Sequence, residues 1–140
     1  MQYKMIDIKT NYAKDEAMGS LSVLESSKDI PFDIKRLYYI QGTKAGVRRG
    51  HHAHKALWQL LICPCGSIRV DMDDGENKEY VILDAPSKGL LMAPGVWHTM
   101  DWLADNALLC VAASDYYDES DYLRNYDDFL AYMSQHPELK

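Results

Sequence analysis

Two histidines that stand two residues apart, His52 and His54, carry the clearest chemical signal in the chain. On a β-strand, residues at this spacing point to the same side, so both imidazoles are expected to project into one cavity. His51 has the opposite parity and is expected to point away, toward a surface or an interface. A pair of imidazoles on one wall serves either metal ligation or proton transfer near neutral pH. The neighbouring residues must decide between these two uses.

The segment from Gly46 to Gly66 resembles the first cupin motif, in the pattern G-x5-HxH-x4-Q-x6-G. Gln59 stands where metal-binding cupins usually carry Glu, which replaces an anionic ligand with a neutral one. The second cupin motif is matched loosely by residues 89–98, because Pro94 lies one residue closer to His98 than the usual spacing. His98 could still complete a set of three histidines. The Gln59 substitution therefore weakens the case for a metal site but does not decide between the two uses.

A second resemblance covers nearly the whole chain, and it is carried by four phrases in order. They are similar to phrases of the WxcM-like sugar 3,4-ketoisomerases. The phrases are Pro31-Phe32-x-Ile34-Lys35-Arg36-x-Tyr38-Tyr39-Ile40, Arg49-Gly50-x-His52-Ala53-His54-Lys55, Pro94-x-Val96-Trp97-His98 and Ala113-Ser114-Asp115-Tyr116-Tyr117-Asp118-Glu119-x-Asp121-Tyr122. Four separate matches in the same order make chance a poor explanation.

This resemblance implies a fold, a reaction and an assembly. The implied fold is all-β, a cupin jelly-roll β-barrel, and the implied assembly is a homodimer, which would also cover exposed strand edges. The implied reaction converts dTDP-4-keto-6-deoxy-D-glucose to a dTDP-3-keto-6-deoxyhexose without a metal or other cofactor. Its product would enter dideoxyamino-sugar biosynthesis for surface polysaccharide such as lipopolysaccharide O-antigen. The Trp97-His98 phrase favours the galacto product.

Such a reaction specifies the side chains that it needs. Moving a ketone from C4 to C3 requires a base that removes the C3 proton, and a donor aimed at the oxygen that gains charge. The sequence leaves open how two histidines would divide the proton transfers, and it names no residue that stacks on thymine. Arginine suits bidentate contact with a pyrophosphate. The predicted catalytic residues are His52, His54, Tyr38 and Arg49, and the predicted substrate-binding residues are Arg36, Gln59, Trp97 and His98.

Short strands separated by turn residues are expected to position these side chains in one domain, residues 1–140. A strand over 31–40 would place Arg36, Tyr38 and Ile40 on one face. Two strands with a bend are expected within 52–66, a hairpin within 67–83, and further strands at 89–92 and 107–113. Only the tail, about 118–134, has apolar residues at helical spacing. Many short strands of this kind predict a sandwich or barrel.

Composition limits the classes of protein that need to be considered. The chain is 47% hydrophobic and 26% charged, which predicts a packed globular core. A net charge of −6 argues against nucleic acid as a partner. No apolar run approaches the length needed to cross a membrane, and no leader-like segment opens the chain, so a cytoplasmic protein is expected. The cysteines, Cys63, Cys65 and Cys110, are predicted to be reduced structural thiols rather than half of a zinc site.

Three alternatives remain open at this point. A metal-dependent cupin enzyme would use His52, His54, Gln59 and His98 as ligands, and metal analysis would reveal it. A related dTDP-sugar epimerase would share the proton abstraction but invert a carbon centre instead of moving the carbonyl. A sugar-binding cupin without catalysis would bind the nucleotide sugar and show no exchange of the C3 proton with solvent.

Overall fold

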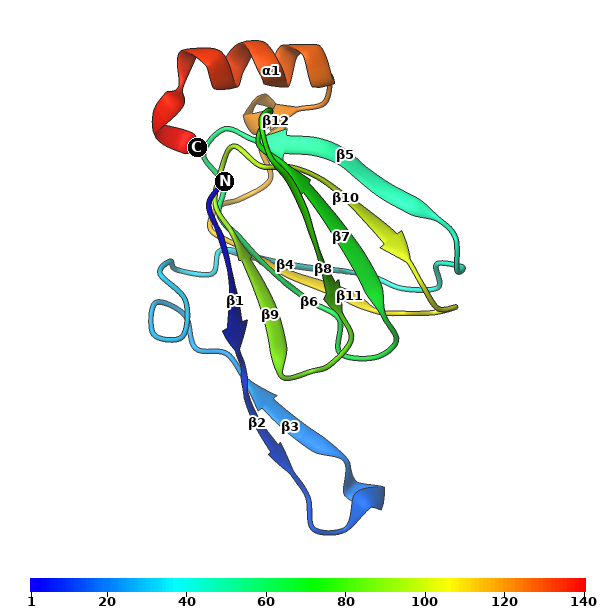
Figure 1. Cartoon of the computed structure of the whole chain (residues 1–140). Coiled ribbons are helices and arrows are strands. Elements are labelled where there is room, and N and C mark those ends of the chain that lie inside the picture. The colour runs from blue at the N-terminus through cyan, green and yellow to red at the C-terminus, as the bar shows by residue number, and fades with distance from the viewer.

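Two five-stranded antiparallel sheets face each other in the computed structural model, which describes all 140 residues (Figure 1). The first sheet has the order β1-β9-β6-β11-β4, built from Tyr3–Asp7, Lys88–Met92, Gln59–Ile62, Leu109–Ala113 and Arg36–Ile40. The second has the order β12-β5-β10-β7-β8, built from Tyr122–Leu123, Arg48–His54, Trp97–Trp102, Ile68–Asp73 and Lys78–Leu83. A separate hairpin consists of β2 (Lys9–Tyr12) and β3 (Ser20–Val23).

The all-β jelly-roll prediction is confirmed, in the form of an open sandwich. No hydrogen-bonded strand pair joins the two sheets, so the barrel is not closed. Apolar side chains from the inner faces of both sheets meet in one core, as is typical of sandwiches. Ile68, Val70 and Met72 of β7 alternate into this core and are at most 1% exposed. The predicted hairpin is β7 with β8, in which Val70 pairs with Val81.

Strand β4 is shorter than the predicted strand but alternates as expected. Arg36, Tyr38 and Ile40 are half-buried, while Leu37 and Tyr39 between them are exposed. The strand begins late because backbone groups of residues 32 and 34 bond to the preceding loop, and pairing with β11 starts only at the N–H of residue 35. For example, the N–H of residue 34 donates to the hydroxyl of residue 26 at 2.8 Å rather than to a strand. The period-two interpretation therefore placed the inward residues of β4 correctly.

The C-terminal helix α1 spans Tyr126–Gln135 and begins later than the predicted start near residue 118. Its first turn is capped by Asn125, whose side chain accepts from the N–H of Asp128 at 3.0 Å. Asp118 caps a separate 3-10 turn over 119–121, and residues 122–123 extend to pair with β5. Two capping side chains and a strand pair thus divide the tail, where apolar spacing alone had suggested one helix.

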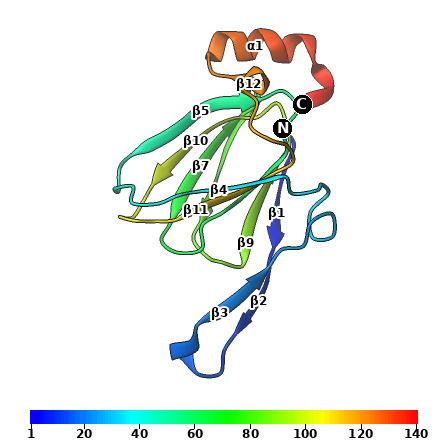
Figure 2. The same cartoon turned by 180° about the vertical axis from the view of Figure 1, so that it is seen from behind.

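Two further features flank the sandwich (Figures 1 and 2). Helix α1 lies across one end of the sandwich, where Phe129 and Met133 pack on Ala53 of β5 and on Leu123. The β2–β3 hairpin projects from the opposite end, away from both sheets. Neither β1 nor this hairpin was predicted, because residues 3–23 lack a clear apolar alternation. No helix is long and apolar enough to span a membrane.

Candidate active site

A β-bulge in β5 decides which of its side chains face the interior. His52 lies opposite His98 of β10, and Gly50 lies opposite Thr99, which leaves His51 as an extra residue. His51 has φ 57° and is exposed, as predicted. A Cβ on Gly50 would lie 2.8 Å from the backbone oxygen of His98, so the close approach of the strands requires glycine here.

The bulge also brings Arg49 to the side occupied by His52. Residues paired directly across two strands point to the same face of a sheet. Arg49 pairs with Met100, which faces inward and is 5% exposed. Arg48 pairs with Asp101 on the outer face, where its Nε donates to the carboxylate at 2.6 Å. A regular strand would have put Arg49 on the outer face instead.

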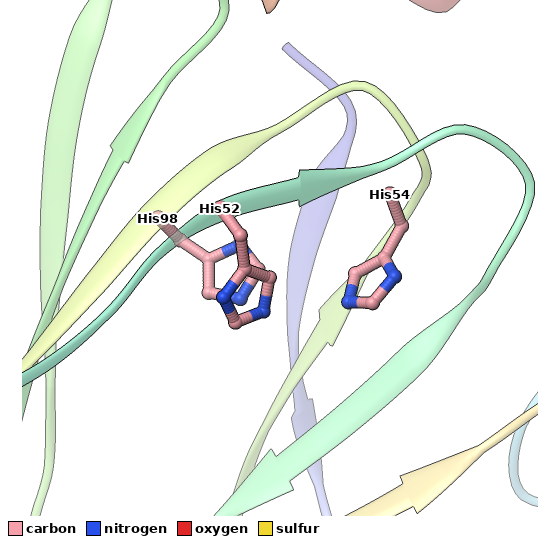
Figure 3. Close-up of side chains that lie close together, drawn as sticks. All are labelled: His52, His54 and His98. Atoms are coloured by element: carbon pink, nitrogen blue, oxygen red, sulfur yellow. The ribbon is translucent and has the colours of Figure 1, made fainter. Parts of the chain in front are cut away.

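Three imidazoles gather on the inner wall (Figure 3), two from β5 and one from β10. The ring centroid of His52 lies 5.1 Å from that of His54 and 4.6 Å from that of His98. Ala53, between the two β5 histidines, is fully buried on the opposite face against Phe129 of α1. The predicted alternation of β5 is therefore present at residues 52–54, and the helix supports that segment from behind.

The larger cavity beside this wall has a volume of about 380 Å³, which is in the range of small-molecule sites. His52 is the only histidine that lines it. Arg36, Arg49 and Arg124 also line it, and no carboxylate does. Tyrosines complete the polar lining, and Tyr38 is one of them. The full lining is Arg36, Tyr38, Ile40, Arg49, Gly50, His52, Met100, Tyr117, Tyr122 and Arg124.

The smaller cavity, of about 140 Å³, opens on the other side of Arg36 and Tyr122, which both cavities share. His54 is its histidine. Its carboxylates come from the segment between β11 and β12. The full lining is Arg36, His54, Ala56, Leu57, Ser114, Asp115, Tyr116, Asp118, Asp121 and Tyr122. The two predicted catalytic histidines thus line different cavities.

His54 has a hydrogen-bond partner on each ring nitrogen. Its Nδ1 lies 3.0 Å from Oδ2 of Asp121, and its Nε2 lies 2.6 Å from Nε2 of Gln59. A carboxylate only accepts and an amide nitrogen only donates, so the network assigns the proton to Nδ1 and leaves Nε2 as an acceptor. His52 differs, because its Nδ1 is buried and has no partner.

Burial keeps all three histidines uncharged near neutral pH. It lowers the pKa of His52, lowers that of His54 to about 3, and lowers that of His98 well below its usual value. Burial also raises the pKa of Tyr38 to about 12, so its hydroxyl keeps its proton. The larger cavity therefore combines a neutral imidazole that can accept a proton with a phenol that can donate a hydrogen bond.

The three histidines are close enough to be considered as metal ligands, since one nitrogen of each lies within 4.8 Å of the others. Nδ1 of His98 donates to the carbonyl of Val96 at 3.0 Å, which leaves its Nε2 free. However, the Nε2 lone pair of His54 is occupied by the Gln59 amide, and Gln59 presents a donor rather than an oxygen. The arrangement as folded does not fit a metal ion held by all three rings.

The structure separates the predicted site residues into four groups. Tyr38, Arg49, His52 and Arg36 meet at the larger cavity. Gln59 and His98 are each 2% exposed and lie behind the wall, lining neither cavity, and His54 faces the smaller cavity. Trp97 points to the outer face and packs edge-to-face on Tyr126 of α1.

Sequence reasoning assigned no role to several residues that line these cavities. Tyr117, Tyr122 and Arg124 line the larger cavity, and Asp121 contacts His54. Most of them belong to the segment that was predicted as helix. Asp121 and Tyr122 end a phrase that carried the family resemblance, and this was the one signal that pointed to them.

The fold and the site together define a cupin-type protein suited to moving protons on a small anionic molecule. Comparison with known proteins makes this class specific. The family described as "WxcM-like, C-terminal" matches residues 1–134. A relative from Aneurinibacillus thermoaerophilus, TDP-4-oxo-6-deoxy-alpha-D-glucose-3,4-oxoisomerase, is 46% identical over 135 residues, which cover 96% of this chain and 95% of the relative.

Solved structures agree with this relative. A 3,4-ketoisomerase from Helicobacter canadensis is 42% identical with a TM-score of 0.90, covering 96% of this chain and 98% of that one. A histidine-to-asparagine mutant of the 3,4-ketoisomerase from Thermoanaerobacterium thermosaccharolyticum, in complex with TDP-4-keto-6-deoxyglucose, is 38% identical with a TM-score of 0.90, covering 96% and 95%. This chain belongs to the WxcM-like family of sugar 3,4-ketoisomerases and is an isomerase.

Proposed function

We propose that this enzyme converts dTDP-4-keto-6-deoxy-D-glucose to a dTDP-3-keto-6-deoxyhexose in the larger cavity, with His52 as the base. One observation carries the proposal. His52, whose Nδ1 has no protein partner, is the only histidine that lines a cavity in which Arg36 and Arg49 have no carboxylate partner. A neutral base beside positive charge suits the enolisation of an anionic sugar nucleotide. The relatives named above support the choice of substrate.

The reaction is an internal redox exchange. His52 removes the proton from C3, and the C3–H electron pair forms a C3–C4 double bond while negative charge moves to the oxygen on C4. The oxygen on C4 takes up a proton to give an enediol. The hydroxyl on C3 then loses its proton and becomes the new carbonyl while C4 takes up a proton, so that two protons leave the C3 side and two arrive at the C4 side. C3 is oxidised and C4 is reduced, so no external oxidant is needed.

We propose that two neighbours of His52 stabilise the charge that develops. The pKa of Tyr38, raised to about 12 by burial, keeps a phenolic proton available for the oxygen of the enediolate. Arg49 lines the same cavity and projects inward because of the bulge. A hydrogen bond that becomes strong only when the oxygen gains charge stabilises the transition state more than the bound substrate. It therefore lowers the reaction barrier more than it strengthens substrate binding.

Arg36 is proposed to hold the pyrophosphate. Its Nε is buried and has no protein partner, although buried donors are normally paired. Its guanidinium lies 5.3 Å from the ring of Tyr38 and 5.6 Å from that of Tyr117, which fixes its position. A phosphate oxygen would satisfy this donor with a charge-assisted hydrogen bond.

The test is an NMR time course of chelator-treated protein with dTDP-4-keto-6-deoxyglucose in deuterated water. The expected result is a 3-keto sugar that carries deuterium at C4. If the chelator-treated enzyme leaves the substrate unchanged and converts it only after metal is restored, the metal-dependent alternative is favoured. Deuterium at C3 with retention of the 4-ketone would favour the epimerase, and binding without any exchange would favour the non-catalytic reading.

The configuration at C4 and the place of the reaction in metabolism are further parts of this proposal. The galacto product is predicted from the Trp97-His98 phrase alone. In ordinary water, a small coupling between H4 and H5 of the product would support it, and a large coupling would mean the gluco product. A 3-keto group is a substrate for amination, which supports a place before an aminotransferase in dideoxyamino-sugar biosynthesis, with O-antigen as the predicted destination. The cytoplasm stays the predicted location.

We also propose that the enzyme acts as a homodimer. Strand β4 is an unpaired edge of its sheet and exposes Leu37 and Tyr39. The projecting β2–β3 hairpin exposes Tyr12 and Leu21, and a lone two-stranded hairpin is marginally stable in water. A second copy would cover both features. Sedimentation equilibrium should give twice the chain mass, and a monomer at the concentrations of the assay would contradict the proposal.

A further inference from the structure

The larger cavity is polar along most of its lining, but two apolar side chains in it have no part in the proposed mechanism. They are Ile40, the last residue of β4, and Met100 of β10. Apart from a glycine, every other residue of the lining is an arginine, a tyrosine or a histidine. An apolar surface inside a polar site is expected to face an apolar part of the ligand.

We propose that Ile40 and Met100 form the subsite for the C6 methyl group of the sugar, and that Met100 selects 6-deoxyhexoses over hexoses with a hydroxyl on C6. This inference rests on the proposed function, because it names the side chains that recognise one group of the substrate proposed above. The methyl is the one apolar substituent on the ring of that substrate. It is therefore the group that gains most from burial against aliphatic side chains.

Met100 lies at the right separation from the base. His98 pairs with His52, and Met100 is two residues further along β10, which corresponds to about 7 Å. Met100 itself pairs with Arg49, the residue proposed to meet the oxygen on C4. C6 is bonded to C5, the carbon next to C4. A sugar whose C3 and C4 lie at His52 and Arg49 therefore brings its methyl group to Met100.

Strand β4 gives the cavity a polar end and an apolar end. Arg36 begins the strand and Ile40 ends it, so the two side chains are separated by about 13 Å on one face. Arg36 is proposed to hold the pyrophosphate, which is attached to C1, across the ring from C4. A sugar nucleotide held in this way directs C4 and its neighbour C5 away from Arg36 and toward Ile40.

The packing around Met100 leaves a hydroxyl without a good partner. Met100 is 5% exposed and belongs to the main core, and Ile40 packs against the same core. A hydroxyl placed here would lose its water and meet hydrocarbon and a thioether sulfur, which is a weak acceptor. Arg49 is the nearest paired donor, and in the proposed mechanism it serves the oxygen on C4. The subsite should therefore accept a methyl and penalise a hydroxymethyl.

The first experiment compares dTDP-6-deoxyglucose, dTDP-glucose and dTDP-xylose, which carry a methyl, a hydroxymethyl and a hydrogen on C5. Calorimetric titration of the wild-type enzyme should show that dTDP-6-deoxyglucose binds on the order of tenfold more tightly than either of the others. Equal affinities for the three would overturn the proposal. None of these compounds contains a ketone, so the comparison does not depend on isomerase activity.

The second experiment assigns the preference to Met100. Met100→Gln offers a hydrogen-bonding group on a chain of similar length and should reduce the preference for dTDP-6-deoxyglucose over dTDP-glucose to about twofold or less. Met100→Leu stays apolar and should keep the preference. Met5→Gln, the same change at an exposed position of β1, is the matched control and should also keep it.

TDP has no sugar, so its affinity serves as the test that each variant is folded. Met100→Gln should bind TDP as the wild type does, and a full preference for the 6-deoxy sugar in that variant would overturn the proposal. If Met100→Gln does not bind TDP, Ile40→Thr replaces it in the comparison. The same loss of preference is expected there, and a full preference would again overturn the proposal.

The third measurement connects the subsite with turnover. The kcat/KM of the wild-type enzyme should be on the order of tenfold higher for dTDP-4-keto-6-deoxyglucose than for dTDP-4-ketoglucose, and Met100→Gln should reduce this ratio. Equal values in the wild type would contradict selection by the subsite. If the wild-type enzyme isomerises neither compound, the proposed function fails, whereas the binding preference still tests the subsite by itself.

Discussion

The two cavities share Arg36 and Tyr122 but differ in charge and in the histidine that they contain. The larger one carries His52, three arginines and no carboxylate, whereas the smaller one carries His54 and three aspartates. We therefore expect an anionic sugar nucleotide to prefer the first cavity, although the charge of Arg124 there is paired with Glu119. The comparison shows that residue spacing places two histidines on one wall, while the residues around each of them give the two cavities different charge.

Replacing the histidine of the larger cavity is expected to have the greatest effect. His52→Asn should lower kcat by on the order of hundredfold or more, because the base is lost while the pyrophosphate contacts stay. His54→Asn should retain more activity, because His54 does not line the larger cavity. Steady-state kinetics with purified variants measures both. An equal loss of kcat in the two variants would contradict the assignment of different roles to the two cavities.

The acidity of the base gives the next largest effect. Burial lowers the pKa of His52 below the ordinary value of 6.5, and the base works only when neutral. The value of kcat/KM should therefore stay constant as pH falls through 6.5, and then decrease by up to about tenfold per pH unit at lower pH. A pH–rate profile checks this. A decrease centred at or above pH 6.5 would show that another group controls the rate.

Folding stability needs to be followed as a control for that profile. The folded forms of His54 and His98 also have lowered pKa values, so the unfolded chain binds protons below about pH 6.5 that the folded chain refuses. Their contribution to stability is complete above the pKa of the unfolded histidine and is lost as pH falls below it. Urea unfolding at each pH identifies the range in which the enzyme stays folded.

The smallest effects are expected for TDP binding when one charged side chain is removed from each cavity. Arg36→Met should weaken TDP binding by about tenfold, because a charge-assisted hydrogen bond to phosphate is lost. Asp115→Asn removes one charge from the smaller cavity and should change TDP binding by less than about twofold. Calorimetric titration with TDP measures both. A stronger effect of Asp115→Asn than of Arg36→Met would place the nucleotide in the smaller cavity.

Much of the larger cavity could be predicted from the sequence, for physical reasons that differ between residues. Period-two alternation placed Arg36, Tyr38 and His52 correctly, because β4 and residues 52–54 are regular strands. Alternation alone would have excluded Arg49, and only the family resemblance brought it in. The bulge that turns Arg49 inward depends on pairing with β10, which no local pattern reveals.

The smaller cavity was largely beyond sequence reasoning. Asp121 lies in a tail whose apolar spacing predicted a helix, whereas capping by Asp118 and pairing of residues 122–123 with β5 gave a turn and a strand. Gln59 was predicted to bind substrate, and the structure places it behind His54. The direction in which a long side chain points, and the partner it finds, depend on contacts between sheets that a single sequence does not encode locally.

The bulge at His51 has a consequence for how sequences of this kind are aligned. In the β5–β10 ladder, Arg49 and Gly50 keep their partners Met100 and Thr99 although one residue is looped out. The ladder would be unchanged in its pairs if position 51 were absent. A chain one residue shorter here could present the same inward side chains, so an alignment across this strand should permit a gap at position 51 and should count paired positions rather than residues.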